Sequence, residues 1–567
     1  MRLNAMKSRF SSAKTGEMLL FGTLIVATTL YLVLMVDPLG ANWRWDDTQI
    51  LLAIHQQPIL SYFSVPEIWR AFTPANLTPW LLVSYQIDLA LVGMLPTFFY
   101  VHQIGALAAV MGLLYTLLRQ WTGRSYALMG CLLFIAGAPI SHVSQQLMTR
   151  HYIEGAVFAL AALILYVRYL RRPRISLLLA SLFAYGLAMT AKEIYVPLVL
   201  CLLFVPESNW NSRIRASLPF WLLALAYSAW RAYMLGSLSG GYGVAGEEGA
   251  VELLSGVALG LLAIPQLLTG PFSLLFWTIV GGLAVGYGLR NPAHLPFMIV
   301  VVACVMGPLL PLTESPGIHA PDRYLFLVWL TLCIAMVIFC SGVLRGRQGT
   351  VLHKVAVPGA VLILLSLLLA NAWTERSKVF AIAKEFDAHA ELLWNNANAI
   401  AYIPSDAILT SFWFAQGLEA LKTQYRPEEG IQLAIIDPLF LYQVSGSISA
   451  LLVYNGDCRC FMDDSDSLVS RMQDFQSNYR PDATLSLDYS YVDRIFSWSA
   501  GPYRQGQWHF LSKELGGLAE VPSQGQLRVS LADGGILYLR YTSPDGWMTY
   551  SEGLEINHPL ASTEWRR

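Results

Sequence analysis

Two adjacent carboxylates, Asp46 and Asp47, lie in the aromatic stretch Trp43-Arg44-Trp45-Asp46-Asp47. They follow a hydrophobic segment, 18–36, closely enough that both are expected at a membrane surface. A carboxylate there can take a proton from an acceptor hydroxyl while a lipid-borne substrate arrives from the bilayer. The second acid could orient the acceptor or raise the pKa of the first. The ordinary alternative is a solvated loop, because acidic residues are common in loops.

Further charged residues are expected at the same surface, at the ends of predicted spans. Lys192, Arg231 and Arg323 lie where the head group of a polyprenyl phosphate would sit, and cations there would stabilise a departing phosphate. The alternative is interfacial snorkelling of each side chain. The predicted substrate contacts in this group are Lys192, Glu193, Arg231, Asp322, Arg323 and Tyr324.

A second acid–base pair, Arg150 and Glu154, opens another apolar segment. Arg150 is predicted to contact phosphate or sugar, and Glu154 to contact substrate or only to gain stabilisation at a helix start. Histidines near this face show no metal-ligand spacing, so no metal and no other cofactor is predicted, although a divalent ion beside Asp46 and Asp47 remains possible. These histidines are His55, His102, His142, His151 and His319.

The composition indicates a protein that crosses a membrane many times. Hydrophobic residues make up 55% of the 567 residues, charged residues only 13%, and the mean hydropathy is +0.48. These values exclude an ordinary soluble globule, and nothing indicates nucleic acid binding. Residues 1–373 are net basic and residues 374–567 net acidic, as expected of a membrane part followed by a domain outside. Basic residues before segment 18–36 predict a retained signal anchor.

Eleven apolar segments predict eleven spans, with the N-terminus cytoplasmic and the C-terminal domain outside. Basic clusters after every second span lie on the N-terminal side in this topology. The apolar stretch 252–270 is interpreted as interfacial or re-entrant, because counting it would place Arg345, Arg347 and Lys354 outside. The predicted spans are 18–36, 97–118, 125–141, 153–170, 176–191, 194–206, 217–235, 272–289, 296–312, 324–343 and 355–372.

Two further regions complete the predicted architecture. The first outward loop, 37–96, is expected to carry short surface helices at 48–55, 64–72 and 80–95. The outside domain, 374–567, is predicted to contain a linking helix, a small α/β region and a β-rich, sandwich-like region. Their ranges are 374–400, 401–480 and 483–560, with strands at 407–410, 432–436, 450–454, 527–531 and 536–540, a helix near 414–423 and a turn at 532–535.

Two side-chain sets in this domain have open roles. Trp498, Tyr503, Trp508 and Trp547 could stack on sugar rings of an acceptor, although aromatic residues in strands more often form the core. The pair Cys458 and Cys460 encloses only one residue, so two unpaired thiols are expected rather than a strained ring.

Three separated patterns carry a family resemblance. They are Trp45-Asp46-Asp47-x-x-Ile50 with Leu77-Thr78-Pro79 and Asp88-x-Ala90-x-x-Gly93-x-x-Pro96, then Leu187-Ala188-Met189-Thr190-Ala191-Lys192-Glu193, then Ala320-Pro321-Asp322-Arg323-Tyr324-Leu325. This membrane half resembles GT-C glycosyltransferases, most closely the transmembrane O-mannosyltransferases with tetratricopeptide repeats and their bacterial relatives. The resemblance implies that an acid of the first loop is the catalytic base. The repeats are absent here, which leaves the acceptor open.

The sequence therefore predicts a GT-C-type α-helical membrane domain, 1–373, followed by a periplasmic domain, 374–567. The predicted enzyme is an inverting hexosyl- or pentosyltransferase of a bacterial inner membrane. It would move a sugar from a polyprenyl-phosphate donor to a protein, lipid A or surface-glycan acceptor, with Asp46 or Asp47 as base. The alternatives are a transporter or lipid flippase, or a non-catalytic envelope-assembly scaffold, each with an external sensing domain.

Overall fold

A computed structural model describes most of the chain. The described residues are 2–55, 57–73, 76–236, 263–307, 309, 321–344, 357–396, 399–404, 409–427, 433–492, 495–512, 516–528, 536–555 and 563–566. Several predictions fall outside them in part, namely those for residues 252–262, His319, Ala320, and the basic cluster Arg345, Arg347 and Lys354.

The chain divides into two compact units. The first comprises Met1–Ala41 and Ile54–Lys384, and the second comprises Asn42–Ala53 and Glu385–Arg567. The short segment Asn42–Ala53, which carries Asp46 and Asp47, thus belongs to the unit formed by the C-terminal part of the chain. The division into a membrane domain, 1–373, and a periplasmic domain, 374–567, stays a prediction.

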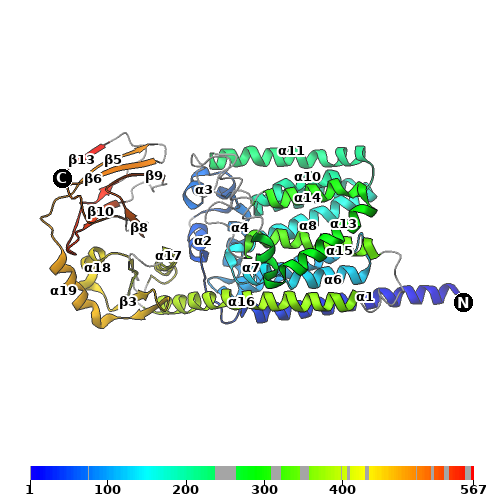
Figure 1. The fold of residues 1–567 in the computed structure, drawn as a ribbon, viewed down its shortest axis with the longest axis horizontal. Coiled ribbons are helices and arrows are strands. Elements are labelled where there is room, and N and C mark those ends of the chain that lie inside the picture. The colour runs from blue at the N-terminus through cyan, green and yellow to red at the C-terminus, as the bar shows by residue number, and fades with distance from the viewer. Residues whose placement is uncertain are drawn as a thin grey trace. The chain divides into compact units, whose positions relative to one another are not determined.

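The first unit is a helical bundle whose long helices run side by side (Figure 1). Proline at the first helical position starts several helices, including α4 and α5, where a missing N–H costs nothing. The helices are α1 (Arg2–Val36), α3 (Pro66–Phe72), α4 (Pro79–Val92), α5 (Pro96–Leu118), α6 (Arg124–Ile135), α7 (Ala138–Val143), α8 (Arg150–Arg171), α9 (Ile175–Ala191), α10 (Val199–Phe204), α11 (Trp210–Leu235), α13 (Ser273–Arg290), α14 (Leu295–Met306), α15 (Arg323–Leu344) and α16 (Val357–Asn395).

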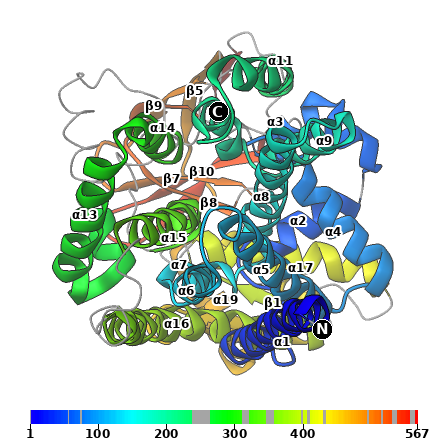
Figure 2. The same ribbon diagram turned by 90° about the vertical axis from the view of Figure 1, so that its right-hand side faces the viewer.

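Six helical stretches among the described residues are long and apolar enough to cross a membrane, so the chain is a multi-pass membrane protein by length and composition. Seen nearly along their length, α5, α8 and α15 lie inside the bundle, while α1, α11 and α13 lie at its margin (Figure 2). Each of the eleven predicted spans overlaps a helix, although several of these helices are short. The number eleven stays a prediction. The described part of stretch 252–270 is helical from Ala263 and leads into α13 through the turn Gly270–Phe272.

Residues 37–96, predicted to form the first outward loop, contain the short helices that were expected there. They are α2 (Asp47–His55), a 3-10 helix (Ile59–Phe63), α3 and α4. The expected linking helix is also present, and it forms one uninterrupted helix, α16, with the last apolar segment. No helix-breaking residue separates the apolar first half of α16 from its charged second half.

The second unit begins with a small α/β region. Its four-stranded sheet has the order β2-β1-β3-β4, with β1 parallel to β2 and β3, and β3 antiparallel to β4. Helix α17 (Leu409–Tyr425) connects β1 to β2, and α18 (Pro438–Val444) leads from β2 toward β3. The strands are β1 (Ala399–Tyr402), β2 (Leu433–Ile435), β3 (Ala450–Asn455) and β4 (Cys460–Asp463), followed by α19 (Leu468–Asn478).

Two antiparallel sheets follow, and they pack face to face around one aromatic core. One has the order β13-β5-β6-β9 and the other β11-β10-β7-β8, with β12 paired to β10. Trp498 and Phe510, from different sheets, have ring centroids 5.3 Å apart. The strands are β5 (Ser486–Val492), β6 (Ile495–Gly501), β7 (Gln507–Ser512), β8 (Gly516–Val521), β9 (Gln524–Arg528), β10 (Ile536–Thr542), β11 (Met548–Tyr550), β12 (Leu554–Glu555) and β13 (Thr563–Arg566). The expected sandwich-like end is present.

Two predictions about this unit are wrong, one on a strand and one on a pair of cysteines. The strand predicted at 407–410 is not formed at its described end, because α17 begins at Leu409, and the strand in this part of the sheet is β1. The described parts of the predicted strands 527–531 and 536–540 are strands of antiparallel sheets, as expected. Strand β9 pairs with β6, and β10 pairs with β7, so the two segments lie in different sheets.

Cys458 and Cys460 form a disulfide, contrary to the two thiols that were expected. They lie in the turn that joins β3 to β4, where Asn455 pairs with Cys460. Arg459 between them has φ +53°, and the two Cα atoms are 5.2 Å apart. The turn itself brings the two cysteines within the range that a disulfide spans.

Candidate functional site

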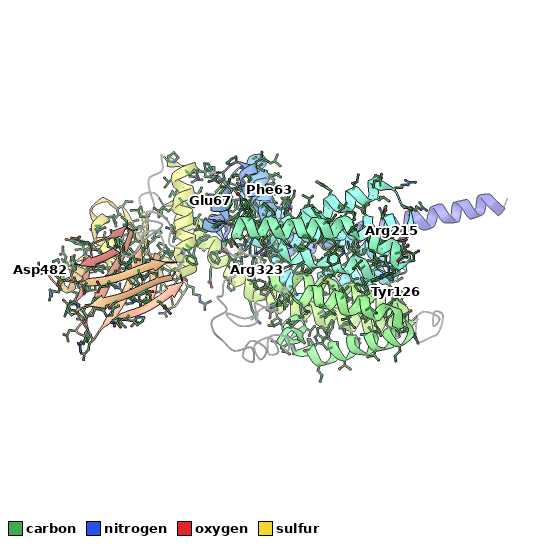
Figure 3. The ribbon with its side chains drawn as sticks, turned by 90° about the horizontal axis from the view of Figure 1, so that it is seen from above. Phe63, Glu67, Tyr126, Arg215, Arg323 and Asp482 are labelled. Carbon is green, nitrogen blue, oxygen red and sulfur yellow. A yellow bond between two sulfur atoms is a disulfide. The ribbon has the colours of Figure 1, made fainter. Side chains whose placement is uncertain are left out.

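Antiparallel packing brings the ends of four helices of the first unit together. Helix α8 begins at Arg150, α9 ends at Ala191, α11 ends at Leu235 and α15 begins at Arg323. In Figure 3, Arg323 lies toward one end of the bundle, while Arg215 and Tyr126 lie toward the other. At that other end, Glu17 of α1 forms an ion pair with Arg119. The residues predicted to contact substrate therefore share one end of the bundle.

Lys192, Arg231 and Arg323, here called the cation cluster, lie at this end. The Arg231 Nε is 2.7 Å from a Glu193 carboxylate oxygen. The Lys192 Nζ donates a hydrogen bond of 2.8 Å to Asn76 Oδ1 and lies 5.2 Å from the ring centre of Tyr152. Tyr152 in turn packs edge-on against Tyr324, the neighbour of Arg323.

Lys192 is buried, with only 7% of its surface exposed. It lies between α9 and the 3-10 helix that begins at Glu193. Burial, with smaller contributions from the positive charges of Arg323 and Arg231, lowers the pKa of Lys192 to about 8, while Glu193 opposes the shift. The charges of Arg323 and Arg231 thus disfavour its ammonium form.

Arg323 is half-buried and lies over the ring of Tyr324, 4.8 Å from its centre. Its guanidinium also donates to the Tyr324 hydroxyl over 3.2 Å. Asp322 accepts a hydrogen bond of 2.9 Å from the Tyr324 N–H and so caps the first turn of α15. Burial raises the pKa of Asp322, whereas the charge of Arg323 lowers it.

The cation cluster carries more positive than negative charge. Two acids accompany its three cations. Glu193 forms an ion pair with Arg231 and favours the charged form of Lys192. Asp322 interacts with the charge of Arg323. In the part of the chain that the structure describes, neither Lys192 nor Arg323 lies within 4 Å of a carboxylate oxygen in an ion pair. Cations held in this way can receive a phosphate.

A second polar group at the same end, here called the paired network, comprises Asp88, His102, Arg150 and Glu154. Arg150 is fully buried, forms an ion pair of 2.5 Å with Asp88 and donates to the Phe99 carbonyl. His102 lies 2.8 Å from Asp88 and 3.3 Å from Glu154. Arg150 thus has a carboxylate partner, and His102 lies within 3.3 Å of both acids of the network.

Glu154 is buried and also accepts hydrogen bonds of 2.8 Å from Trp80 Nε1 and Ser84 Oγ. These contacts occupy both carboxylate oxygens. Arg150 and Glu154 thus have partners within the fold, and their contact with substrate stays a prediction. A direct contact of Arg150 with a ligand would require its buried pair with Asp88 to open.

The acid pair lies in the second unit, and its two members differ in exposure. Asp47 is fully buried at the start of α2, where its Oδ2 accepts a hydrogen bond of 2.9 Å from the Arg44 N–H. Asp46 is exposed. The preceding residue, Trp45, has φ +45°, a left-handed conformation that turns the chain there. The turn directs one carboxylate into the fold and the other to the surface.

Several residues of these groups were missed or undervalued in the sequence. Asn76 and Leu77, in the first outward loop, bind Lys192 and Glu193 respectively, since Leu77 N–H donates to Glu193 over 2.8 Å. No role is predicted for His102 from the sequence, yet its ring lies 2.8 Å from Asp88 and 3.3 Å from Glu154. Leu77 and Asp88 could have been found from the sequence, because both belong to the family pattern that begins at Trp45.

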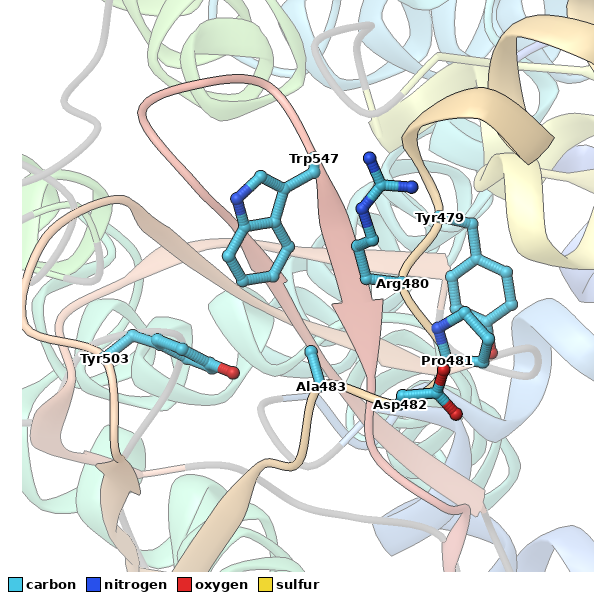
Figure 4. A pocket seen from close by; sticks show the side chains of 7 residues that line it. All are labelled: Tyr479, Arg480, Pro481, Asp482, Ala483, Tyr503 and Trp547. Carbon is cyan, nitrogen blue, oxygen red and sulfur yellow. The ribbon is translucent and has the colours of Figure 1, made fainter.

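A separate pocket of about 480 Å³ lies on the β-sandwich of the second unit (Figure 4). Trp547 and Tyr503 line one side, with ring centres 5.5 Å apart. Arg480 and Asp482 are exposed at its other side. Of the four aromatic residues singled out above, Trp498 and Trp508 are core residues instead. The pocket is lined by Tyr479, Arg480, Pro481, Asp482, Ala483, Tyr503 and Trp547.

Metal binding has no support from side-chain groupings. Among the described residues, no group of three or more His, Cys, Asp and Glu side chains is arranged to hold a metal ion.

Comparison with known proteins gives a fold-level likeness. No family model matches the chain, and no curated protein matches it. Two solved structures of ArnT from Cupriavidus metallidurans are similar, one bound to undecaprenyl phosphate and one in the apo state. Each is 11% identical to this chain, and the TM-scores are 0.41 for the bound and 0.42 for the apo structure. The matches cover 79% and 80% of this chain, respectively, and 98% of the ArnT chain in each case. At these identities and TM-scores, no family, residue role or substrate of this chain is taken from the likeness.

Proposed function

We propose that this chain is a membrane glycosyltransferase that moves a sugar from a polyprenyl-phosphate donor to a hydroxyl acceptor, with inversion at the anomeric carbon. The observation that carries the proposal is the cation cluster, in which Lys192 and Arg323 have no ion-pair carboxylate among the described residues. Buried cations that lack compensating charge are costly unless an anion binds them. A phosphate at a bundle end, with its lipid tail in the bilayer, meets that need.

Asp46 is proposed as the general base. Its exposure allows an acceptor hydroxyl to reach it, whereas Asp47 is buried and bound to the backbone of Arg44. The Asp46 carboxylate would take the hydroxyl proton, and the acceptor oxygen would attack the anomeric carbon. A new carbon–oxygen bond would form as the bond from that carbon to the phosphate oxygen breaks.

The cation cluster would stabilise the leaving phosphate. As the carbon–oxygen bond breaks, negative charge grows on the polyprenyl phosphate, so Lys192, Arg231 and Arg323 would bind the transition state more tightly than the ground state. Glu193 and Asn76 would hold two of these cations in place. No soluble nucleotide sugar is required.

The placement of charge also argues against a transporter. A transporter needs ionisable residues deep within its spans. Among the described residues, Arg150, Lys192 and Arg231 are buried charges close to helix ends of the bundle.

The proposal also includes the location and the acceptor. The membrane is a bacterial inner membrane, and the acceptor is a protein, lipid A or a surface glycan at its outer face.

The test is transfer of labelled sugar from membrane lipid-linked donors to envelope fractions. Asp46→Asn is expected to reduce the transfer rate about 10²- to 10⁴-fold without loss of folded protein, because the base is removed. Asp47→Asn is expected to lower the yield of folded protein. Asp474→Asn, an exposed acid on α19, is the matched control and should behave as wild type.

Full activity of a well-folded Asp46→Asn protein would remove the base assignment. No transfer by the wild-type protein from any lipid-linked donor would favour the scaffold or transporter readings instead.

A further inference from the structure

The segment that carries the proposed base is fixed by a buried ion pair from the C-terminal part of the chain. Both partners, Arg44 and Asp387, belong to the second unit. Arg44 donates from Nε to Asp387 Oδ1 and from its Nη2 to Oδ2, each over 2.7 Å. Arg44 is fully buried and Asp387 is 8% exposed. Two parallel hydrogen bonds define the orientation of both groups.

The same carboxylate also holds the backbone of the segment. The Asn42 N–H donates to Asp387 Oδ1 over 2.8 Å. The Arg44 N–H then donates to Asp47, and the Asp47 N–H donates back to the Arg44 carbonyl over 3.0 Å. Asp46 lies within this closed turn. Its position is therefore determined by a chain of contacts that begins at Asp387.

Packing against two helices supports the turn from its other side. Trp45 contacts Phe386, the neighbour of Asp387, with ring centres 5.3 Å apart. A side-chain carbon at Gly417 of α17 would lie 2.7 Å from the Thr48 Cβ, so α2 and α17 approach as closely as glycine permits. Gln49 Nε2 also donates to the Trp413 carbonyl over 2.7 Å.

We propose that Asp387 is a positioning residue for the transfer reaction: acting through Arg44, it fixes the turn that presents Asp46. This proposal rests on the function proposed above. It gives the linking helix α16 a role in catalysis, because α16 carries both Asp387 and Phe386. A misplaced base is slow even when its chemistry is intact, and small displacements can cost about a hundredfold in rate.

The experiment compares full-length Asp387→Ala, Arg44→Ala and the exchanged pair Arg44→Asp with Asp387→Arg. Two readouts are used: kcat and donor KM for transfer from lipid-linked sugar, and amide hydrogen exchange over residues 42–50. Asp387→Ala is expected to lower kcat about 10- to 100-fold with little change in donor KM, and to speed exchange in this segment. Asp387→Asn keeps one of the two acceptor oxygens. Its kcat and its exchange rate should therefore lie between those of wild type and Asp387→Ala.

The matched control is Asp464→Ala, which breaks a partly exposed Arg–Asp pair, Arg471 with Asp464, in the same unit. It should leave kcat and the exchange of residues 42–50 as in wild type. If Asp387→Ala speeds exchange while the protein stays folded but kcat is unchanged, Asp387 does not position the base. If exchange is also unchanged, the ion pair does not fix the turn.

The two proposals fail in different ways. Full activity of Asp46→Asn would overturn the assigned base, whereas the hydrogen-exchange result would still report on the Arg44–Asp387 pair. Loss of activity in Asp46→Asn together with full activity in Asp387→Ala would overturn only the positioning role. Where Asp387→Ala does not fold, Asp387→Asn supplies both readouts.

Discussion

The cation cluster and the paired network lie at the same end of one helical bundle, yet they differ in charge balance. In the paired network, Arg150 meets Asp88, and His102 lies between Asp88 and Glu154. In the cation cluster, Lys192 and Arg323 are held by Asn76 and Tyr324, which are neutral. A balanced buried network serves the fold, whereas an unbalanced one is suited to an anionic ligand. Charge balance therefore predicts a structural role for the paired network and a ligand-binding role for the cation cluster.

The largest effect should come from breaking the paired network. Arg150→Met is expected to cost about 3–5 kcal/mol of stability, because it leaves the Asp88 carboxylate buried without its partner. Thermal unfolding in detergent measures this loss. Glu17→Gln, which breaks the more exposed pair with Arg119, is the control and should cost about 1 kcal/mol or less. A stable Arg150→Met protein that fails to bind donor would place Arg150 with the ligand contacts instead.

Removal of a cation from the cation cluster should lower activity and leave stability nearly unchanged. Arg323→Ala is expected to reduce kcat/KM for the lipid-linked donor about 10²- to 10³-fold, since charge stabilisation of the leaving phosphate is lost. Its thermal stability should change little, because Arg323 forms no ion pair among the described residues. Arg215→Ala, at the other end of the bundle, is the control. Equal loss of stability and activity in Arg323→Ala would show that this side chain serves the fold.

The pH dependence of donor binding should report the charge of Lys192. Its pKa of about 8 means that the ammonium form is present below pH 8 and is lost as the pH rises above it. Donor affinity is therefore expected to fall up to about tenfold per pH unit above 8. Lys192→Arg, which stays charged over this range, should abolish the dependence. A wild-type affinity that is flat from pH 7 to 9.5 would contradict the role of this charge.

The smallest effect is expected at the sandwich pocket, which has one cation and one anion, Arg480 and Asp482. Because these two charges balance, the pocket is expected to bind a neutral sugar rather than a phosphate. Trp547→Ala is expected to raise the acceptor KM about 2- to 10-fold through lost stacking, with donor KM unchanged. Trp373→Ala, an exposed aromatic residue outside the pocket, is the control. A change in donor KM alone would exclude an acceptor role for the pocket.

Prediction from the sequence succeeded where a signal was local. The apolar segments, the short helices of the first outward loop, the linking helix and helix α17 follow from runs of residues whose character is visible in the chain. The sequence also placed Lys192 and Arg323 at span ends, and the structure brings both to one end of the bundle. The local signal failed at strand 407–410, because α17 begins at Leu409. It also did not show that β9 pairs with β6 and β10 with β7, because pairing of strands depends on distant segments.

The functional contacts divide in the same way. The acidic pair could be recognised from its type and position, but no local pattern distinguishes exposed Asp46 from buried Asp47. Arg44 lies beside that pair, and nothing near it in sequence identifies Asp387, 343 positions later, as its partner. The same holds for Lys192 and Asn76, which are 116 positions apart.

The sequence by itself determined that this protein crosses a membrane, where its helices lie and which ionisable residues occupy the span ends. These properties follow from hydrophobicity and charge, which act on each segment separately. Only the tertiary structure decided which charges are neutralised, because an ion pair depends on distance between groups that folding brings together. It left Lys192 and Arg323 without carboxylate partners in the described chain, paired Arg150 with Asp88, and attached the turn of Asp46 to Asp387.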